Sequence, residues 1–419
     1  MRVGSNLATN LRLAAALGAI SMSLLLALEA RSETKGAKSN ATVPQKQKFL
    51  NLDIAQARLD AGQFWIKDSQ GQRWPLCVDV PLQRSARRNL ALSHPESGAL
   101  VAIEVRTGKI LVMSEWPPPA SNDRSLLLRQ LPAASLFKLV TSAALIEQAR
   151  IMPDRIVCTS GGTHRVEEEN LLPPQSGTAE CGPFAEALGY SRNAVFAQLA
   201  HRYLQPEDLE NFADRFGFGS PLPLEIHVPM GEFATDVEPL SFARAATGFV
   251  GSTLTPVGAA YIAYVIANRG RAEPLQLLDE PERTVSVGMQ TVAAIQPETA
   301  DRLHRMMEMT VRKGTSWRAF HDERGRPYLP HVSVAGKTGT LSEKEATFSW
   351  FVGFAPSQQP EIAFSIVLQN GPVWHRKANE IAREWLREYF ARQRANSLAG
   401  RRTRRATSEI YASASKRNP

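Results

Sequence analysis

The most restrictive feature of this sequence is a pair of strand-like regions that stand far apart, at 98–115 and 332–369. In the first region, apolar runs at 98–105 and 109–115 flank Arg106-Thr107-Gly108, a pattern typical of a hairpin. In the second, 332–336 precedes two further runs at 347–355 and 361–369. The block between the two regions has helical spacing. One antiparallel sheet built from both ends of the chain, with helices packed against it, satisfies this order.

The apolar spacing predicts where those helices lie. We expect helices at 133–148, 193–204, 256–268 and 299–311, and a last amphipathic helix at 377–392 that covers the sheet. Near the N-terminal end, a second hairpin is expected between 63 and 80, around Asp68-Ser69-Gln70-Gly71. The expected fold class is therefore α/β of the α+β type.

The first 30 residues have the composition of a signal peptide or N-terminal membrane anchor. Arg2 and Arg12 precede or flank an uncharged run, Leu13 to Leu28, which would span about 24 Å as a helix against a hydrocarbon core of about 30 Å. This length suits a signal peptide better than an anchor, and Ala30 offers a small residue for cleavage. In either case the rest of the chain is expected to be exported, to the periplasm or the outer face of the cytoplasmic membrane. Residues 31–77 then form a linker and a short N-terminal segment before the main domain at 78–390.

The formal net charge of +8 is concentrated at the C-terminal end. Residues 391–419 carry seven Arg, one Lys and one Glu, so they account for +7 of the total. This basic tail has no apolar periodicity, and we expect it to be disordered. It is either a solvated terminus or a segment that contacts anionic lipid or polymer transiently. Because the rest of the chain is close to neutral, no nucleic acid is expected as a partner.

Three cysteines are too few for a disulfide scaffold. Cys158 and Cys181 bracket a polar loop and would form one bridge in an oxidising compartment. Two buried free thiols, or a zinc site completed by His164, are the alternatives, and the zinc site lacks paired ligand spacing. We therefore expect no metal.

A serine and a lysine spaced for contact begin the helix expected at 133–148. Ser135 and Lys138 lie three residues apart, so both side chains fall on one face of a helix whose first N–H groups can serve an oxyanion. Phe137, Leu139 and Val140 flank the lysine, and burial among them would favour its neutral form. A serine nucleophile with an amine base can perform acyl transfer without histidine. The structural alternative is a helix-capping serine and a lysine that extends to solvent.

A second motif, Ser191-Arg192-Asn193, precedes the helix expected at 193–204. Ser191 would pass a proton towards a leaving amine, and Asn193 would hold Lys138 or a substrate amide. Either residue is also a good helix cap, so the structural alternative stays open.

The third motif, Lys337-Thr338-Gly339-Thr340, lies where the strands resume. Gly339 would let a substrate backbone approach closely because it has no Cβ. Thr340 would offer its N–H as an oxyanion donor, and Thr338 and Lys337 would recognise a carboxylate.

Other catalytic patterns are absent from the sequence. The GKT at 336–338 resembles the end of a phosphate-binding loop, but His331 stands where that loop needs glycine and a strand follows. There is no Gly-x-Ser-x-Gly elbow and no His-Glu-x-x-His zinc pair. The acidic run at 167–170 is interpreted as a solvated turn.

The order of the three motifs resembles that of the penicilloyl-serine transferases, and most closely the transpeptidase domain of penicillin-binding proteins. The resemblance spans about 78–390 and extends to VAIEVRTGKI at 101–110, LTPV at 254–257 and WFVGFAP at 350–356. It implies a β-lactamase/transpeptidase-like fold, a five-stranded antiparallel sheet flanked by helices plus an all-helical subdomain, with the active site at their junction. Arg192 departs from the small residue common at that position and would narrow the cleft.

The resemblance also implies roles. Ser135 would attack the penultimate D-alanyl carbonyl of a peptidoglycan stem peptide, Lys138 would accept its proton, and the acyl group would pass to an amine of a neighbouring strand. β-Lactam antibiotics would acylate Ser135 because they imitate D-Ala-D-Ala. No metal or organic cofactor is implied. Expected partners are peptidoglycan stem peptides, β-lactams, cell-wall synthesis proteins and, through an uncleaved N-terminal segment, the membrane.

Two alternatives remain. Water would take the acyl group in a D,D-carboxypeptidase or a serine β-lactamase, although Asn193 disfavours the β-lactamases whose first motif is most similar. A non-catalytic β-lactam sensor or cell-wall assembly scaffold would keep the fold, and the complete motifs disfavour it.

Overall fold

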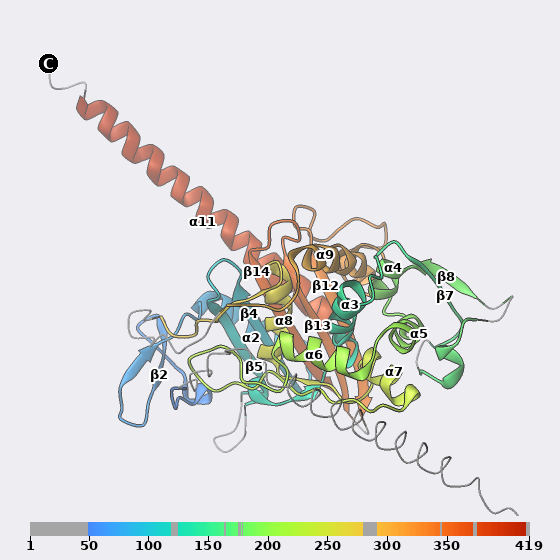
Figure 1. Cartoon of the computed structure of the whole chain (residues 1–419). Coiled ribbons are helices and arrows are strands. Elements are labelled where there is room, and N and C mark those ends of the chain that lie inside the picture. The colour runs from blue at the N-terminus through green and yellow to red at the C-terminus, as the bar shows by residue number, and fades with distance from the viewer. Residues whose placement is uncertain are drawn as a thin grey trace, which may run out of the picture. The chain divides into compact units, whose positions relative to one another are not determined.

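A sheet made from both ends of the chain forms the centre of the structure, a computed structural model that describes residues 49–118, 125–162, 165–174, 177, 179–279, 291–343, 346–371 and 375–415. Its five strands pair antiparallel throughout, in the order β12-β13-β14-β4-β5 (Figure 1). Their bounds are β4 Ser97–Glu104, β5 Ile110–Trp116, β12 Ala335–Glu343, β13 Ala346–Ala355 and β14 Ile362–Asn370. The pairing of β14 with β4 sets Ile362 opposite Glu104, which confirms that distant segments close one sheet.

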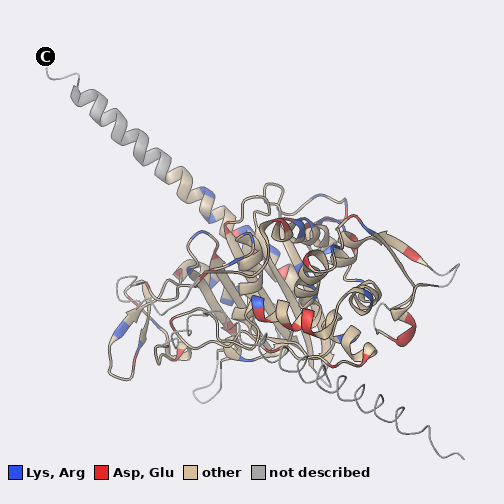
Figure 2. Ribbon diagram, viewed as in Figure 1, with Lys and Arg blue, Asp and Glu red and all other residues tan. Residues whose placement is uncertain are grey.

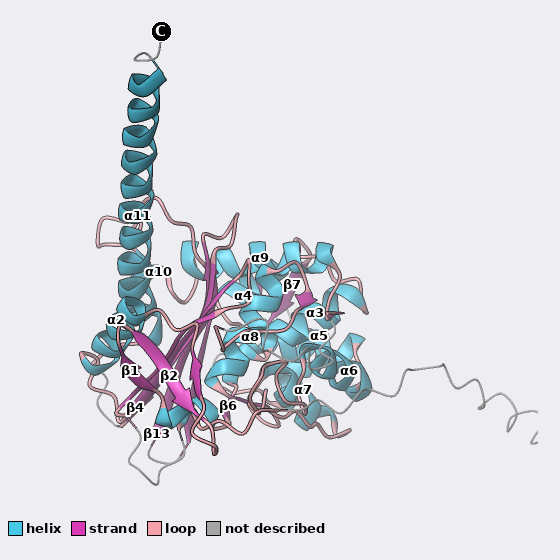
Figure 3. Ribbon diagram, turned by 90° about the vertical axis from the view of Figure 1, so that its left-hand side faces the viewer, coloured by secondary structure: helices cyan, strands magenta, loops and turns pink. Residues whose placement is uncertain are grey.

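Both faces of this sheet are buried. Along β4 the side chains alternate: Ala99, Val101 and Ile103 belong to one hydrophobic core, and Leu100 and Ala102 to another. The first core includes residues of helices α3 (Lys138–Glu147), α8 (Pro256–Ala267) and α9 (Pro297–Arg312), and the second includes residues of α2 (Val80–Ala91) and α11 (Ala378–Ser415). The sheet is therefore a layer between two sets of helices (Figure 3). Charged residues lie mostly on the surrounding helices and loops, while the strands are largely tan (Figure 2).

The helices expected from the sequence are present, but the one expected from residue 133 begins at Lys138 and the one expected to end at residue 392 continues to Ser415. They are α3 Lys138–Glu147, α5 Asn193–Tyr203, α8 Pro256–Ala267, α9 Pro297–Arg312 and α11 Ala378–Ser415. The structure adds helices that the sequence analysis did not predict: α2 Val80–Ala91, α4 Phe184–Gly189, α6 Pro206–Phe216, α7 Pro239–Thr247 and α10 Trp317–Phe320. Signals for two of these were available, since α6 and α7 begin with proline and end before a left-handed glycine, Gly217 and Gly248.

The hairpin predicted around residues 68–71 is also present, as part of a small N-terminal sheet. This sheet consists of β1 Arg58–Asp60, β2 Gln63–Lys67 and β3 Arg73–Pro75. Ile66, Trp74 and Leu76 are buried in the first core. The segment 58–77 therefore packs with the main domain, whereas the sequence analysis placed it before the domain boundary.

Short elements complete the described chain. Paired strands are β6 Leu131–Pro132 with β9 Thr253–Leu254, β7 Ile156–Thr159 with β8 Glu180–Pro183, and β10 Arg271–Ala272 with β11 Val292–Ala293. Single 3-10 turns are η2 Ile54–Gln56, η3 Leu126–Leu128, η4 Ala134–Leu136 and η5 Glu168–Leu171.

The structure differs from the prediction at the C-terminal end of the chain and does not describe the segment predicted at the N-terminal end. Helix α11 continues to Ser415, which differs from the disorder predicted from residue 391. The range 391–415 contains no proline and only one glycine, Gly400, so nothing in its sequence breaks the helix that precedes it. The apolar segment predicted within residues 1–30 lies outside the described residues. Among the helices that are described, none combines the length and apolar character needed to cross a bilayer.

Candidate active site

Ser135 lies in the 3-10 turn η4, which leads into α3, rather than in the α-helix itself. Ala134, just before it, has φ of 50°, a left-handed conformation that residues other than glycine rarely adopt. Gly248 packs against the same turn, where a Cβ would lie 2.0 Å from the Ala134 carbonyl oxygen. Ser135 occupies no capping position, so the capping alternative is excluded. Tertiary packing therefore holds a strained turn that presents Ser135 half-exposed.

Lys138 is fully buried beside this serine. Its Nζ lies 2.9 Å from Ser135 Oγ and 3.2 Å from Ser191 Oγ, and it donates a hydrogen bond to Asn193 Oδ1. Burial, and next the charge of Lys337, lower the pKa of Lys138 well below its usual range. The lysine therefore does not extend to solvent, and its neutral form can accept the proton of the Ser135 hydroxyl.

The second motif lies between two amines. Ser191, which has φ of 58°, sets its Oγ 3.2 Å from Lys138 Nζ and 2.9 Å from Lys337 Nζ. Asn193 is the first residue of α5 and is 6% exposed. The N-cap position belongs to Arg192 and has no side-chain hydrogen bond, so neither Ser191 nor Asn193 serves as a plain cap of α5.

Lys337 is placed differently from the expectation. Its side chain is fully buried, and Nζ donates to Ser191 Oγ at 2.9 Å and to the Thr338 carbonyl at 2.7 Å. Burial lowers the pKa of Lys337 to about 7. The amine thus contacts Ser191 rather than the cleft, and its charge would act on a substrate carboxylate through space and through these hydrogen bonds.

The rest of the third motif runs along β12, the edge strand of the sheet. Thr338 and Thr340 line the cleft, as residues two apart on one strand face. A Cβ at Gly339 would lie 3.3 Å from Trp350 Cβ and 3.4 Å from Ala134 Cβ. The missing side chain of Gly339 therefore lets β12 pack against the turn that carries Ser135. The expectation that it also makes room for a substrate backbone stays a prediction.

These residues meet in a cleft of about 740 Å³. Its lining includes Thr315 and Trp350, which the sequence analysis missed because neither belongs to a recognised catalytic pattern. Thr315 Oγ1 lies 2.6 Å from Thr338 Oγ1, and Trp350 Nε1 donates to the Pro132 carbonyl at 3.0 Å. The guanidinium of Arg192 lies over the ring of Tyr190, 5.6 Å from its centroid, and Arg192 is not part of the cleft wall.

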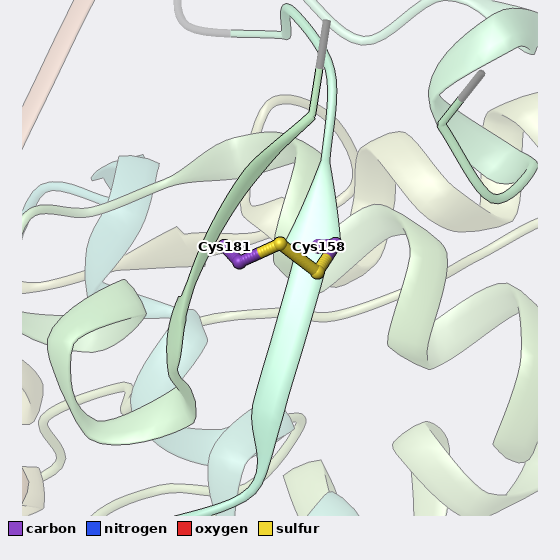
Figure 4. The surroundings of a disulfide bond; sticks show 2 residues. All are labelled: Cys158 and Cys181. Atoms are coloured by element: carbon purple, nitrogen blue, oxygen red, sulfur yellow. A yellow bond between two sulfur atoms is a disulfide. The ribbon is translucent and has the colours of Figure 1, made fainter. Parts of the chain in front are cut away.

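The cysteine pair lies on the β7–β8 hairpin, where a disulfide joins Cys158 to Cys181 with their Cα atoms 4.0 Å apart (Figure 4). Thiolates for a zinc site are therefore not available there, and His164 lies outside the described residues. Among the residues that are described, no group of three or more His, Cys, Asp or Glu could hold a metal ion. The acidic run forms the 3-10 turn η5 with Glu167 as its N-cap, and Glu167 pairs with Arg244. Its three glutamates are exposed as expected of a solvated turn, whereas Asn170 is buried.

The comparisons with known proteins agree with this geometry. Residues 98–389 match the family described as "Penicillin binding protein transpeptidase domain", and the chain belongs to that family. It is 26% identical over 323 residues to "Peptidoglycan D,D-transpeptidase PbpA" of Mycobacterium tuberculosis, covering 66% of this chain and 62% of that protein. It is 27% identical over 382 residues to "Stage V sporulation protein D" of Bacillus subtilis, covering 83% of this chain and 56% of the other. The chain thus spans about six tenths of the length of these relatives.

Solved structures show the same fold. Penicillin-binding protein A from M. tuberculosis, solved as an imipenem acyl-enzyme complex, superposes with a TM-score of 0.61 at 22% identity, over 75% of this chain and 79% of that one. The five-stranded sheet between helical layers is therefore the transpeptidase fold that the sequence resemblance implied.

Proposed function

We propose that this chain is a serine-type D,D-transpeptidase that forms an acyl-enzyme on Ser135 with peptidoglycan stem peptides and is inhibited by β-lactams. One observation carries the proposal: the buried amine of Lys138 lies 2.9 Å from Ser135 Oγ, and its pKa is lowered well below the usual value. A lowered pKa favours the neutral amine, and a neutral amine at this distance can take the hydroxyl proton and make the serine a nucleophile.

The remaining residues fit the steps that follow. When Ser135 Oγ attacks the carbonyl, its proton passes to Lys138 Nζ, and from there through Ser191 Oγ to the departing amine. Asn193 orients Lys138 by accepting its hydrogen bond. Thr338 offers a hydroxyl to the terminal carboxylate, and Thr340 and Ser135 supply backbone N–H groups to the oxyanion.

The composition of the cleft favours a transferase over a rapid hydrolase. Among the described residues that line it, none is an aspartate or a glutamate. Rapid hydrolysis of an acyl-enzyme needs a base that activates water, and a carboxylate is the usual one. An acyl-enzyme that water hydrolyses slowly persists long enough to react with an amine instead. We therefore expect a stable penicilloyl adduct, and turnover of benzylpenicillin within seconds would favour the β-lactamase or carboxypeptidase alternative.

The proposed substrate places the reaction outside the cytoplasm, at the peptidoglycan. The apolar segment at 13–28 supports export of the domain, with membrane attachment if it is retained. We further propose that this chain associates with cell-wall synthesis proteins. A scaffold without catalysis remains the alternative that a fully functional Ser135→Ala variant would favour.

Labelling with a fluorescent penicillin tests the proposal. The adduct should map by mass spectrometry to the peptide that contains Ser135, and Ser135→Ala should abolish it while its melting temperature stays near that of the parent. Ser342→Ala is a matched control, because Ser342 also lines the cleft but contacts Thr347 rather than either lysine. Labelling at another residue, or undiminished labelling of Ser135→Ala, would refute the assignment.

A further inference from the structure

The two proposed oxyanion donors lie on separate elements of the structure. The N–H of Ser135 belongs to the turn η4, and the N–H of Thr340 belongs to the edge strand β12. When Ser135 Oγ bonds to the carbonyl carbon, the carbonyl oxygen gains negative charge, and both donors must lie where that charge develops. Because the two residues are far apart in the chain, local geometry does not fix the distance between their N–H groups. The packing of η4 against β12 therefore decides how well the oxyanion is bound.

Trp350 connects these two elements. It lies on β13, opposite Gly339 of β12 and opposite Val367 of β14. Because β13 pairs on both sides, two ladders of hydrogen bonds fix the backbone that carries this indole. The residue is 1% exposed, and its Nε1 donates to the Pro132 carbonyl at 3.0 Å, three residues before Ser135. One side chain thus joins the central sheet to the segment that carries the nucleophile.

The packing at Gly339 shows how closely these parts meet. A Cβ built at this position would lie 3.3 Å from Trp350 Cβ and 3.4 Å from both Ala134 Cβ and Leu136 Cγ. Strand β12, the turn η4 and Trp350 are therefore in mutual contact at one point. Since Thr340 is the next residue along β12, a change at Trp350 alters the spacing between η4 and the Thr340 N–H.

The turn that carries the nucleophile depends on its surroundings. Ala134 has φ of 50°, a conformation that persists only where neighbouring groups hold it. Backbone groups supply part of this support, because the Ser252 carbonyl accepts the N–H of Ala133 at 3.0 Å and Gly248 packs against the Ala134 carbonyl. The indole of Trp350 adds a hydrogen bond from the sheet. A turn under strain shifts when one of its supports is removed.

From these contacts, and resting on the proposed function, we infer that Trp350 is a positioning residue for acylation: its indole, hydrogen-bonded to Pro132, sets the separation of the Ser135 and Thr340 N–H groups. The indole takes no proton and forms no bond with the substrate. It acts on the rate of acylation rather than on the affinity for the ligand, because the oxyanion donors are needed where charge develops in the transition state.

Rapid-quench mass spectrometry on the purified full chain tests this inference. Acylation of Ser135 over a range of benzylpenicillin concentrations gives the binding constant of the first complex and the rate constant of acylation separately. Trp350→Phe keeps an aromatic ring and removes the N–H. It should lower the rate constant by about tenfold or more and change the binding constant by less than about twofold. Trp317→Phe is a matched control that should keep both constants, because Trp317 is a half-buried indole on α10 and is not among the described residues that line the cleft.

Two further measurements isolate the hydrogen bond and the oxyanion. Replacing Trp350 with benzothienylalanine keeps the shape of indole and removes only its N–H, so it should slow acylation in the same direction as Trp350→Phe. A depsipeptide analogue of D-Ala-D-Ala and its thionoester differ only in the oxygen or sulfur of the attacked carbonyl. The ratio of their acylation rates reports how well the two N–H groups fit an oxyanion, and it should fall at least about threefold in the benzothienylalanine chain.

The benzothienylalanine chain decides the outcome, with its melting temperature as the check that it is folded. An unchanged rate constant of acylation in this chain would overturn the inference, since the hydrogen bond to Pro132 would then play no part. Slower acylation with an unchanged ratio of oxygen to sulfur would overturn it as well. Both results leave the proposed function intact. Failure of the parent chain to form any adduct at Ser135 would instead refute the proposed function, and the inference with it.

Discussion

Replacing Lys337 by methionine should change how the stability of this protein depends on pH. Lys337 is fully buried, and its pKa falls from 10.5 to about 7 through burial. Between about pH 7 and pH 10.5, therefore, the amine of Lys337 is protonated in the unfolded chain and neutral in the folded chain. Unfolding becomes harder as pH rises from about 7 to about 10.5, and below pH 7 Lys337 adds no further pH dependence.

The magnitude follows from the same two values. At about 1.36 kcal/mol per pH unit, the interval from 10.5 to about 7 corresponds to about 5 kcal/mol, of which about 3.5 kcal/mol falls between pH 7 and pH 10. Lys337→Met removes this contribution. The substitution also removes the charge of Lys337, which helps to lower the pKa of Lys138. The loss of this charge further reduces the dependence of the free energy of unfolding on pH. The free energy of unfolding of the variant should therefore rise by about 3.5 kcal/mol less than that of the parent over this range.

Urea denaturation at pH 7, 8.5 and 10, with the disulfide intact, measures this difference. Lys67→Met is a matched control, because Lys67 is an exposed lysine on β2 and its loss should leave the pH dependence parallel to that of the parent. Parallel curves for Lys337→Met and the parent would refute the argument, since they would mean that burial does not lower the pKa of this amine. The proposed state of Lys138 rests on the same physics and would then be in doubt.

Two further predictions concern what holds the site. Gly248→Ala should destabilise the protein by about 3 kcal/mol or more, because the new Cβ would lie 2.0 Å from the Ala134 carbonyl oxygen and the backbone there has φ of 82°. Gly339→Ala should mainly slow acylation, because the nearest contacts of its new Cβ are 3.3 Å and longer. Thermal melts and penicillin labelling separate the two effects, and equal destabilisation would contradict the account. Reducing the Cys158–Cys181 bridge, whose cysteines are 23 residues apart, should lower stability by about 3 kcal/mol. Denaturation with and without reductant checks it, and an unchanged midpoint would show that the hairpin unfolds independently.

The sequence predicted the elements that have strong local signals. Alternating apolar runs at 98–105 and 361–369 indicated strands, and the spacing at 133–148 indicated a helix, because these patterns follow from the geometry of a strand and of a helix. The disorder predicted from residue 391 differed from the structure. Charge and the lack of apolar periodicity report whether a segment can pack, not whether a helix that has already begun will stop.

The sequence indicated which types of residue form the candidate site, but not how their side chains contact one another. The motif order and the apolar helix around them identified Ser135 and Lys138, and their contact follows because residues three apart lie close on a helical turn. The sequence did not indicate that Lys337 contacts Ser191, or that Thr315 lies 2.6 Å from Thr338. These contacts join elements far apart in the chain, so only the packing of β12 against η4 and α9 determines them.

By itself, then, the sequence indicated which side chains are candidates for the chemistry and where the segments with strong apolar periodicity form strands or helices, because both depend on residues that are neighbours in the chain. The tertiary structure decided how those side chains act. Packing buries the amines of Lys138 and Lys337 beside the hydroxyl of Ser191, and burial lowers the pKa of both amines. Packing also holds Ala134 in a left-handed conformation. Desolvation and strain of this kind arise from the surroundings of a residue, and residues distant in sequence supply those surroundings.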